Sequence, residues 1–174
     1  DPGTPSRRLS AENHGFITGV DDIYYDENED ALFFNGNGVI ADRGLYIKNI
    51  NYVSGDSDQI NDLEIEARIK LKSNETQHGG GDQRIIFSYD RSEVFRFSVG
   101  SDFGGYTTNQ SAAKGKLVLG FKNTDGTHDI YDKGYTGDLR DENWHTVKVS
   151  FTANEAGGLK FYVDGELTYT DPST

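Results

Sequence analysis

Carboxylates at alternate positions are the residues in this chain whose spacing most directly suggests chemistry. Asp56 and Asp58 lie in the polar stretch 54–62, which ends at Asp62. Ca²⁺ prefers a shell of oxygen ligands from carboxylates, carbonyls and water, and such ligands usually come from loops. We therefore expect Asp56, Asp58 and Asp62 to be calcium ligands, although a solvated acidic loop has the same composition.

Asp62, Glu64 and Glu66 form a second pattern, because alternate residues of a β-strand point to the same face. Retaining glycoside hydrolases use two carboxyl groups roughly 5–5.5 Å apart. Residues i and i+2 of a strand are separated by about 6.5–7 Å, so the spacing permits this chemistry. The simpler interpretation is the polar face of a half-buried strand, since Trp144 is the only tryptophan with which to line a sugar cleft.

Other reactive residue types are scattered along the chain. There is no cysteine, which excludes thiol catalysis and zinc ligation by cysteine. No Gly-x-Ser-x-Gly nucleophile motif is present. His128, beside an Asp-Gly pair, is better explained as a turn residue than as a metal ligand. The four histidines are His14, His78, His128 and His145.

Tyrosines with acidic or amide neighbours are candidates for ligand binding. Glycan sites combine an aromatic ring with a few polar groups that fix the orientation of the sugar. Each of these tyrosines is also compatible with a cross-strand pair inside a sheet. The candidate ligand-binding residues are Tyr89 with Asp90 and Tyr106 with Asn109, and a third pair of the same type is Tyr131 with Asp132.

Short alternating stretches must position these residues, and they predict an all-β fold. The clearest is 144–170, in which a strand, a turn at 154–158, a second strand, Asp164-Gly165 and a return strand follow one another. Asp-Gly favours a type I′ hairpin turn, which needs positive φ at both central positions. Further strands are predicted at 16–25, 31–40, 45–53, 63–71, 84–89, 93–100, 116–122 and 129–132. Such spacing predicts an antiparallel sandwich.

The run W-H-T-V-K-V-S-F followed by L-K-F-Y-V-D-G-E-L resembles the core signature of the laminin G-like branch of the concanavalin A-like superfamily. The stretch 63–71 resembles another strand of these modules, and 31–40, with Phe-Asn-Gly, resembles their opening strand. The resemblance implies a jelly-roll sandwich of two curved antiparallel sheets, and a packing or hydrogen-bonding role for His145. The candidate core residues are Trp144, Val147, Val149, Phe151, Leu159, Phe161 and Val163.

Residues 19–25, G-V-D-D-I-Y-Y, resemble the closing strand of the superfamily, which ordinarily comes last. Two interpretations stay open: a domain that is permuted or split at its ends, and an ordinary opening strand. On the first, this segment lies beside 31–40 and takes the place of the final strand. The resemblance then implies a calcium ion held by Asp21 and Asp22 together with backbone carbonyls of Gly36 and Gly38.

Composition and charge narrow the class of partner. The 174-residue chain has a net charge of −12, which argues against nucleic acid because phosphate backbones would be repelled. It has no apolar run of membrane-spanning length. We expect a linker at 1–8 and a single domain at 9–174, and a start at Asp1 is typical of a mature or excised fragment.

The sequence therefore predicts a non-catalytic module of a large calcium-dependent, adhesin-like protein, located outside the cell or at its surface. Its expected partners are a cell-surface glycan or neighbouring domains of the same polypeptide, so glycan binding and structural scaffolding both stay open. The alternative is a glycoside hydrolase of the laminarinase type that uses the strand with Asp62, Glu64 and Glu66. The order Asp, Glu, Glu departs from the pattern of those hydrolases.

Overall fold

The computed structural model describes residues 15–18, 23–34, 44–47, 62–71, 84–89, 95–100, 115–122 and 127–172. Every regular element in these ranges is a β-strand, and the ranges contain no helix. The chain divides into two compact units, residues 1–58 and 59–174. Each unit has its own strand pairing, so the two are described in turn.

The first unit contains four short strands in two antiparallel pairs. In one pair, β1 (Gly15–Thr18) lies beside β4 (Gly44–Ile47). In the other, β2 (Ile23–Asp26) lies beside β3 (Ala31–Phe34). Within the described residues, the 19–25 segment lies beside the 31–40 strand, because Ile23 pairs with Phe34. This pairing of consecutive strands fits both interpretations of the segment.

The turn between β2 and β3 is built by aspartates. Asp26 Oδ1 accepts the backbone N–H of Asn28 at 2.9 Å and that of Glu29 at 3.3 Å. Asp30 adopts a φ of 49°, and the hydroxyl of Tyr25 hydrogen-bonds to its carboxylate. Asp and Asn are favoured in such turns because their short side chains hydrogen-bond to nearby backbone groups and tolerate positive φ.

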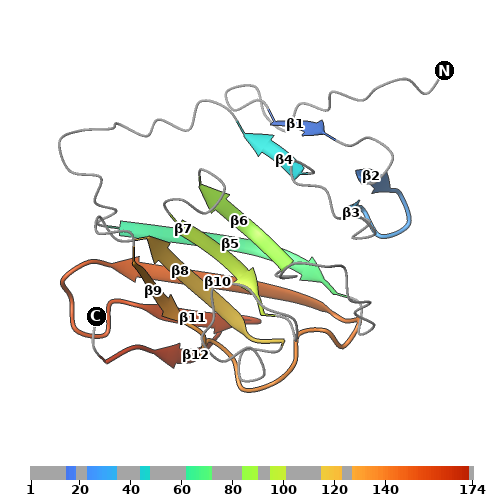
Figure 1. The fold of residues 1–174 in the computed structure, drawn as a ribbon. Coiled ribbons are helices and arrows are strands. Elements are labelled where there is room, and N and C mark those ends of the chain that lie inside the picture. Colours follow the sequence, from blue (N-terminus) through green and yellow to red (C-terminus); the bar gives the residue numbers. More distant parts are fainter. Residues whose placement is uncertain are drawn as a thin grey trace. The chain divides into compact units, whose positions relative to one another are not determined.

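The second unit contains two four-stranded antiparallel sheets (Figure 1). Sheet I has the order β12-β11-β10-β5 and sheet II the order β6-β7-β8-β9. Sheet I is formed by β5 (Asp62–Lys70), β10 (Trp144–Thr152), β11 (Lys160–Val163) and β12 (Glu166–Thr170). Sheet II is formed by β6 (Arg84–Tyr89), β7 (Phe95–Val99), β8 (Leu117–Lys122) and β9 (His128–Tyr131).

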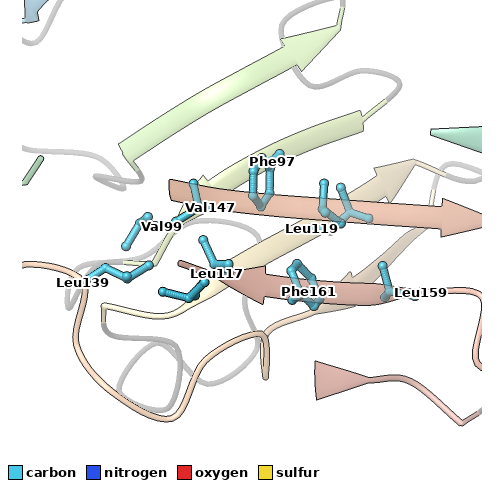
Figure 2. Packing of buried hydrophobic residues seen from close by; sticks show 10 residues of the cluster. Phe97, Val99, Leu117, Leu119, Leu139, Val147, Leu159 and Phe161 are labelled. Atoms are coloured by element: carbon cyan, nitrogen blue, oxygen red, sulfur yellow. The ribbon is translucent and has the colours of Figure 1, made fainter. Parts of the chain in front are cut away.

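Buried side chains from both sheets meet in one hydrophobic core (Figure 2). Alternate residues of β10 and β11 point into it, as expected for strands with one covered face. The arrangement fits an antiparallel β-sandwich, so the all-β prediction is confirmed. The core residues are Phe97, Val99, Leu117 and Leu119 from sheet II, Val147, Val149, Phe161 and Val163 from sheet I, and Leu139 and Leu159 from the connections.

The predicted hairpin after β11 is confirmed in detail. Asp164 and Gly165 both have positive φ, of 54° and 83°, as a type I′ turn requires. One core prediction was wrong. Trp144 is only half-buried, because it alternates with Val147 and Val149 and therefore lies on the opposite face of β10.

The segment between β9 and β10 is held against the sandwich by close backbone contacts. The N–H of Gly134 donates to the carbonyl of Leu117 at 3.3 Å. A Cβ atom at Gly134 would lie 2.7 Å from Cβ of Leu117 and 2.8 Å from Cγ of Phe161, so only glycine fits. Further along, the buried Arg140 donates to both carboxylate oxygens of Asp138, at 2.8 and 2.6 Å. These contacts fix the start of β10.

Candidate functional site

The outward face of sheet I is the surface of the sandwich opposite the core. On β5, Leu63, Ile65, Ala67 and Ile69 pack against the core, and the residues between them are exposed. This confirms the predicted alternation. β10 continues the outward face, because its residues pair in register with those of β5. The facing pairs are Trp144 with Lys70, Thr146 with Arg68, Lys148 with Glu66 and Ser150 with Glu64.

Two aromatic rings on the outward face lie beneath cations. The guanidinium carbon of Arg68 lies 4.4 Å from the centroid of the Trp144 ring, and Nζ of Lys70 lies 6.0 Å from it. On β11, the ring of Tyr162 has Nζ of Lys148 at 4.8 Å. Such contacts are attractive because the ring face carries negative charge density. Each ring is therefore contacted by a cation from a neighbouring strand.

The three carboxylates proposed for hydrolysis lie on the same outward face. Asp62, Glu64 and Glu66 are all exposed, as their spacing predicts. Glu64 Oε2 lies 3.7 Å from Nζ of Lys148, so a cation from the next strand faces this group. Leu167, which pairs with Tyr162 across the sheet, is 55% exposed and extends the face onto β12.

His145 lies between two aspartates at the start of β10. Its Nδ1 is 2.8 Å from Oδ2 of Asp164, and its Nε2 is 3.1 Å from Oδ1 of Asp141. The second oxygen of Asp164 accepts the backbone N–H of Thr146 at 2.9 Å. The three residues Asp141, His145 and Asp164, here named the His145 clamp, tie the segment before β10 to the β11–β12 turn. The predicted hydrogen-bonding role of His145 is thus confirmed.

The electrostatics of the His145 clamp favour its charged form. Hydrogen bonds from Asn143 and from His145 lower the pKa of Asp141 to about 2. The pKa of Asp164 is lowered by the hydrogen bond from His145 and by the backbone N–H of Thr146. Burial lowers the pKa of His145, but the hydrogen bonds and charges of both aspartates together outweigh it and raise the pKa above 6.5.

The predicted calcium ligands lie mostly beyond the described residues. Asp62 is the first residue of β5, and the part of the chain that the structure describes contains no cluster of three or more histidine, aspartate or glutamate side chains suited to a metal. The remaining candidates lie outside the described residues. They are Asp21, Asp22, Gly36, Gly38, Asp56 and Asp58.

Of the predicted ligand-binding residues, only the backbone of Tyr89 is described, at the end of β6. Asp90, Tyr106 and Asn109 lie outside the described residues. The third pair, Tyr131 and Asp132, is described.

Near Tyr131, the hydroxyl of Tyr169 donates to Asp171 at 3.0 Å. Burial and the charges of Asp129 and Asp171 raise the pKa of Tyr131. The carboxylate of Asp171 therefore interacts with both Tyr131, at the end of β9, and Tyr169, on β12.

Sequence reasoning missed the outward-facing contact of Arg68 with Trp144 and that of Lys148 with Tyr162. The signal was present, because the alternation that places Val147 and Val149 inward necessarily places Trp144 outward. The partners of His145 gave no such signal, since Asp141 and Asp164 lie in turns. No helix in the described ranges has the length and apolarity needed to cross a membrane. Comparison of the chain with protein-family models, curated proteins and solved structures finds no match.

Proposed function

We propose that the chain is a non-catalytic glycan-binding module of a large adhesin-like protein, located outside the cell or at its surface. The observation that carries this proposal is the outward face of sheet I, where Trp144 and Tyr162 lie among cationic and hydroxyl side chains. Sugar-binding surfaces combine aromatic rings with a small number of placed polar donors.

The outward face is suited to binding because the strands that form it pack against the hydrophobic core with their opposite face. Val147, Val149 and Phe161, on the inner side of the same strands, are fully buried. A site on such strands needs little reordering when a ligand arrives, which reduces the entropic cost of binding. Thr146 places a hydroxyl group on β10 between Trp144 and Lys148, the residue that pairs with Tyr162, and Ser150 places another beyond Lys148.

The exposure of the β5 carboxylates supports a binding role over hydrolysis. The acid of a glycosidase must keep its proton near neutral pH, which enzymes achieve by placing it in an apolar pocket. Glu64 and Glu66 are instead exposed, and Glu64 faces the ammonium group of Lys148. We therefore propose that Asp62, Glu64 and Glu66 are surface residues of a binding module.

The finer fold that we propose is a jelly roll of the concanavalin A-like type, in which residues 19–25 take the place of the final strand. The antiparallel pairing of β2 with β3 supports this order. Calcium, bound near Asp21 and the carbonyls of Gly36 and Gly38, belongs to the same proposal. Scaffolding against neighbouring domains is the second role left open by the sequence.

A glycan screen tests the proposed function. The chain is applied to an array of neutral and acidic glycans, once with calcium and once with chelator. We expect binding that Trp144→Ala and Tyr162→Ala each reduce, while Tyr24→Ala, at an exposed tyrosine of the first unit, leaves it unchanged. Absence of binding to every glycan would contradict the proposal and favour scaffolding.

A further inference from the structure

We infer that one end of the outward face binds a saccharide through an anionic group, a carboxylate or a sulfate. This end, here named the cationic end, consists of Arg68, Lys70 and Trp144. The inference rests on the proposed glycan-binding function and adds the position of the ligand and its charge.

Charges on β5 are segregated along the strand. Asp62, Glu64 and Glu66 occupy its first half, and Arg68 and Lys70 occupy its second half, all on the exposed face. On β10, the acidic half faces Ser150 and Lys148, whereas the cationic half faces Thr146 and Trp144. Arg68 and Lys70 therefore place two positive charges at alternate positions of β5 on a chain whose net charge is −12. The nearby carboxylates of Asp141 and Asp164 are engaged by His145.

The stacking of Arg68 on Trp144 selects the type of ligand. A neutral sugar stacks on an open aromatic face, but the guanidinium of Arg68 lies over this ring at 4.4 Å. A guanidinium on an aromatic face keeps its N–H donors in its own plane, where they can bind a carboxylate or sulfate with two parallel hydrogen bonds. Trp144 thus orients a donor group for an anion.

The second ring of the outward face is less suited to an anion. Lys148, which lies over Tyr162, is 3.7 Å from the carboxylate of Glu64. That carboxylate partly neutralises Lys148 and would repel an incoming acidic sugar. The anionic group is therefore assigned to Arg68, and the remainder of the saccharide extends toward Tyr162.

The charge of the whole chain limits the length of the ligand. Electrostatic repulsion between the domain and a long polyanion acts over a Debye length of about 10 Å at 0.1 M salt. A short acidic oligosaccharide places one charge at Arg68 and brings fewer further charges near the acidic half of β5 than a long polyanion does. The inferred ligand is therefore a short acidic saccharide.

Trp144 is the only tryptophan, so its fluorescence reports directly on the cationic end. The fluorescence of the full chain is followed during titration with four ligands: trigalacturonate, its methyl ester, a sulfated disaccharide and sodium sulfate. Calorimetry measures the affinity for each ligand independently. We expect trigalacturonate or the sulfated disaccharide to bind at least about tenfold more tightly than the uncharged ester. Which of the two binds more tightly identifies the anionic group.

Variants separate a local contact from general electrostatics. Arg68→Gln should weaken binding of the acidic sugar about tenfold or more, and Arg68→Lys should weaken it less, because it keeps the charge but loses the planar donor pair. Lys160→Gln, the same loss of charge on β11 of the same sheet, should change affinity less than about twofold. Equal losses in Arg68→Gln and Lys160→Gln would overturn the assignment.

Three outcomes distinguish this inference from the proposed function. Equal binding of trigalacturonate and its ester would overturn the inference and leave glycan binding intact. Binding of sodium sulfate as tight as that of either acidic sugar would overturn it too, since the site would then recognise an ion alone. If no saccharide binds here and none binds in the glycan screen, the proposed function fails together with the inference.

Discussion

His145 Nδ1 lies 2.8 Å from Oδ2 of Asp164, a residue 19 positions later in the chain. His145 belongs to the Trp-His pair that opens β10, and Asp164 belongs to the Val-Asp-Gly turn between β11 and β12. The Trp-His part and the Val-Asp-Gly part of the pattern that resembles the laminin G-like signature are therefore joined by the contact between His145 and Asp164. Asp164 has two roles: its backbone adopts the positive φ of the turn, 54°, and its carboxylate contacts His145.

Asp164→Ala should lower the free energy of unfolding by about 1–2 kcal/mol, because it removes the hydrogen bonds of the carboxylate with His145 and Thr146. The cost is modest because this side chain is half exposed and its charge is partly screened by solvent. Asp164→Asn should cost less, since asparagine tolerates positive φ and still accepts the N–H of Thr146. Urea unfolding measures both. Equal costs for the two variants would show that the turn conformation and the Thr146 bond contribute nothing.

The stability of the domain should depend on pH through the His145 clamp. The pKa of His145 is raised in the folded state, so its contribution is complete below about pH 6.5 and is lost as pH rises through the raised value. The pKa values of Asp141 and Asp164 are lowered, so their contribution is complete above about pH 4 and is lost as pH falls.

Melting temperatures between pH 3 and pH 9 should therefore peak between about pH 4 and pH 6.5. His145→Gln should flatten the decline above pH 6.5, because glutamine does not titrate. Asn143→Ala, which changes a neighbour of Asp141 that does not titrate, serves as the control and should keep that decline. A decline of the same size in His145→Gln would assign it to other groups.

Phe161→Ala should lower the free energy of unfolding by about 3–5 kcal/mol. The ring is fully buried between Phe97 and Tyr169, whose ring centroids lie 6.4 and 6.3 Å away. Leu167→Ala, at an exposed position of the neighbouring strand, should stay within about 0.5 kcal/mol of the parent. A loss below about 1 kcal/mol for Phe161→Ala would be incompatible with its place in the core.

Assays with β-glucans should show no turnover, because Glu64 and Glu66 are exposed and a cation faces Glu64. Release of reducing sugar is the measurement, with Glu64→Gln and Glu66→Gln as the informative variants. Activity that either variant abolishes would establish the hydrolase alternative. Activity that both variants retain would point to a contaminating enzyme.

Calcium should raise the melting temperature relative to chelator, because an ion that binds only the folded chain stabilises it by mass action. Asp21→Ala should remove the increase, and Asp58→Ala tests the second predicted cluster independently. Magnesium at the same concentration is the control for ionic strength. Identical melts with calcium and chelator, in the parent and in Asp21→Ala, would remove support for the ion and for the proposed strand exchange.

Local patterns sufficed to predict much of the fold. The alternation in β5 and β10 and the Asp-Gly turn predicted the strands, their two-sided character and one hairpin, because these follow from side-chain direction and backbone preference. Which face of β10 points inward stayed open. The placement of Trp144 failed for an informative reason. A large apolar side chain was assigned to the core by its type, whereas its position relative to Val147 assigns it to the opposite face.

The candidate site was harder to predict because its parts come from strands far apart in the chain. The stacking of Arg68 on Trp144 depends on the register between β5 and β10, which neither strand specifies alone. The clamp likewise needs Asp141 and Asp164 to approach His145 from two different turns. The periodicity of side chains along one strand does not indicate which residues of distant strands and turns will contact each other.

The pairing of β5 with β10 has a consequence for the order in which the chain folds. During synthesis β5 emerges long before β10, and β6, β7, β8 and β9 are all made in between. Sheet II can form from neighbouring strands as they appear, whereas β5 must wait for a distant partner, and such contacts slow folding. An amphipathic strand without its partner is prone to pair with other nascent chains. The charged side chains on the exposed face of β5 oppose such aggregation until β10 has been made; they are Glu64, Glu66, Arg68 and Lys70.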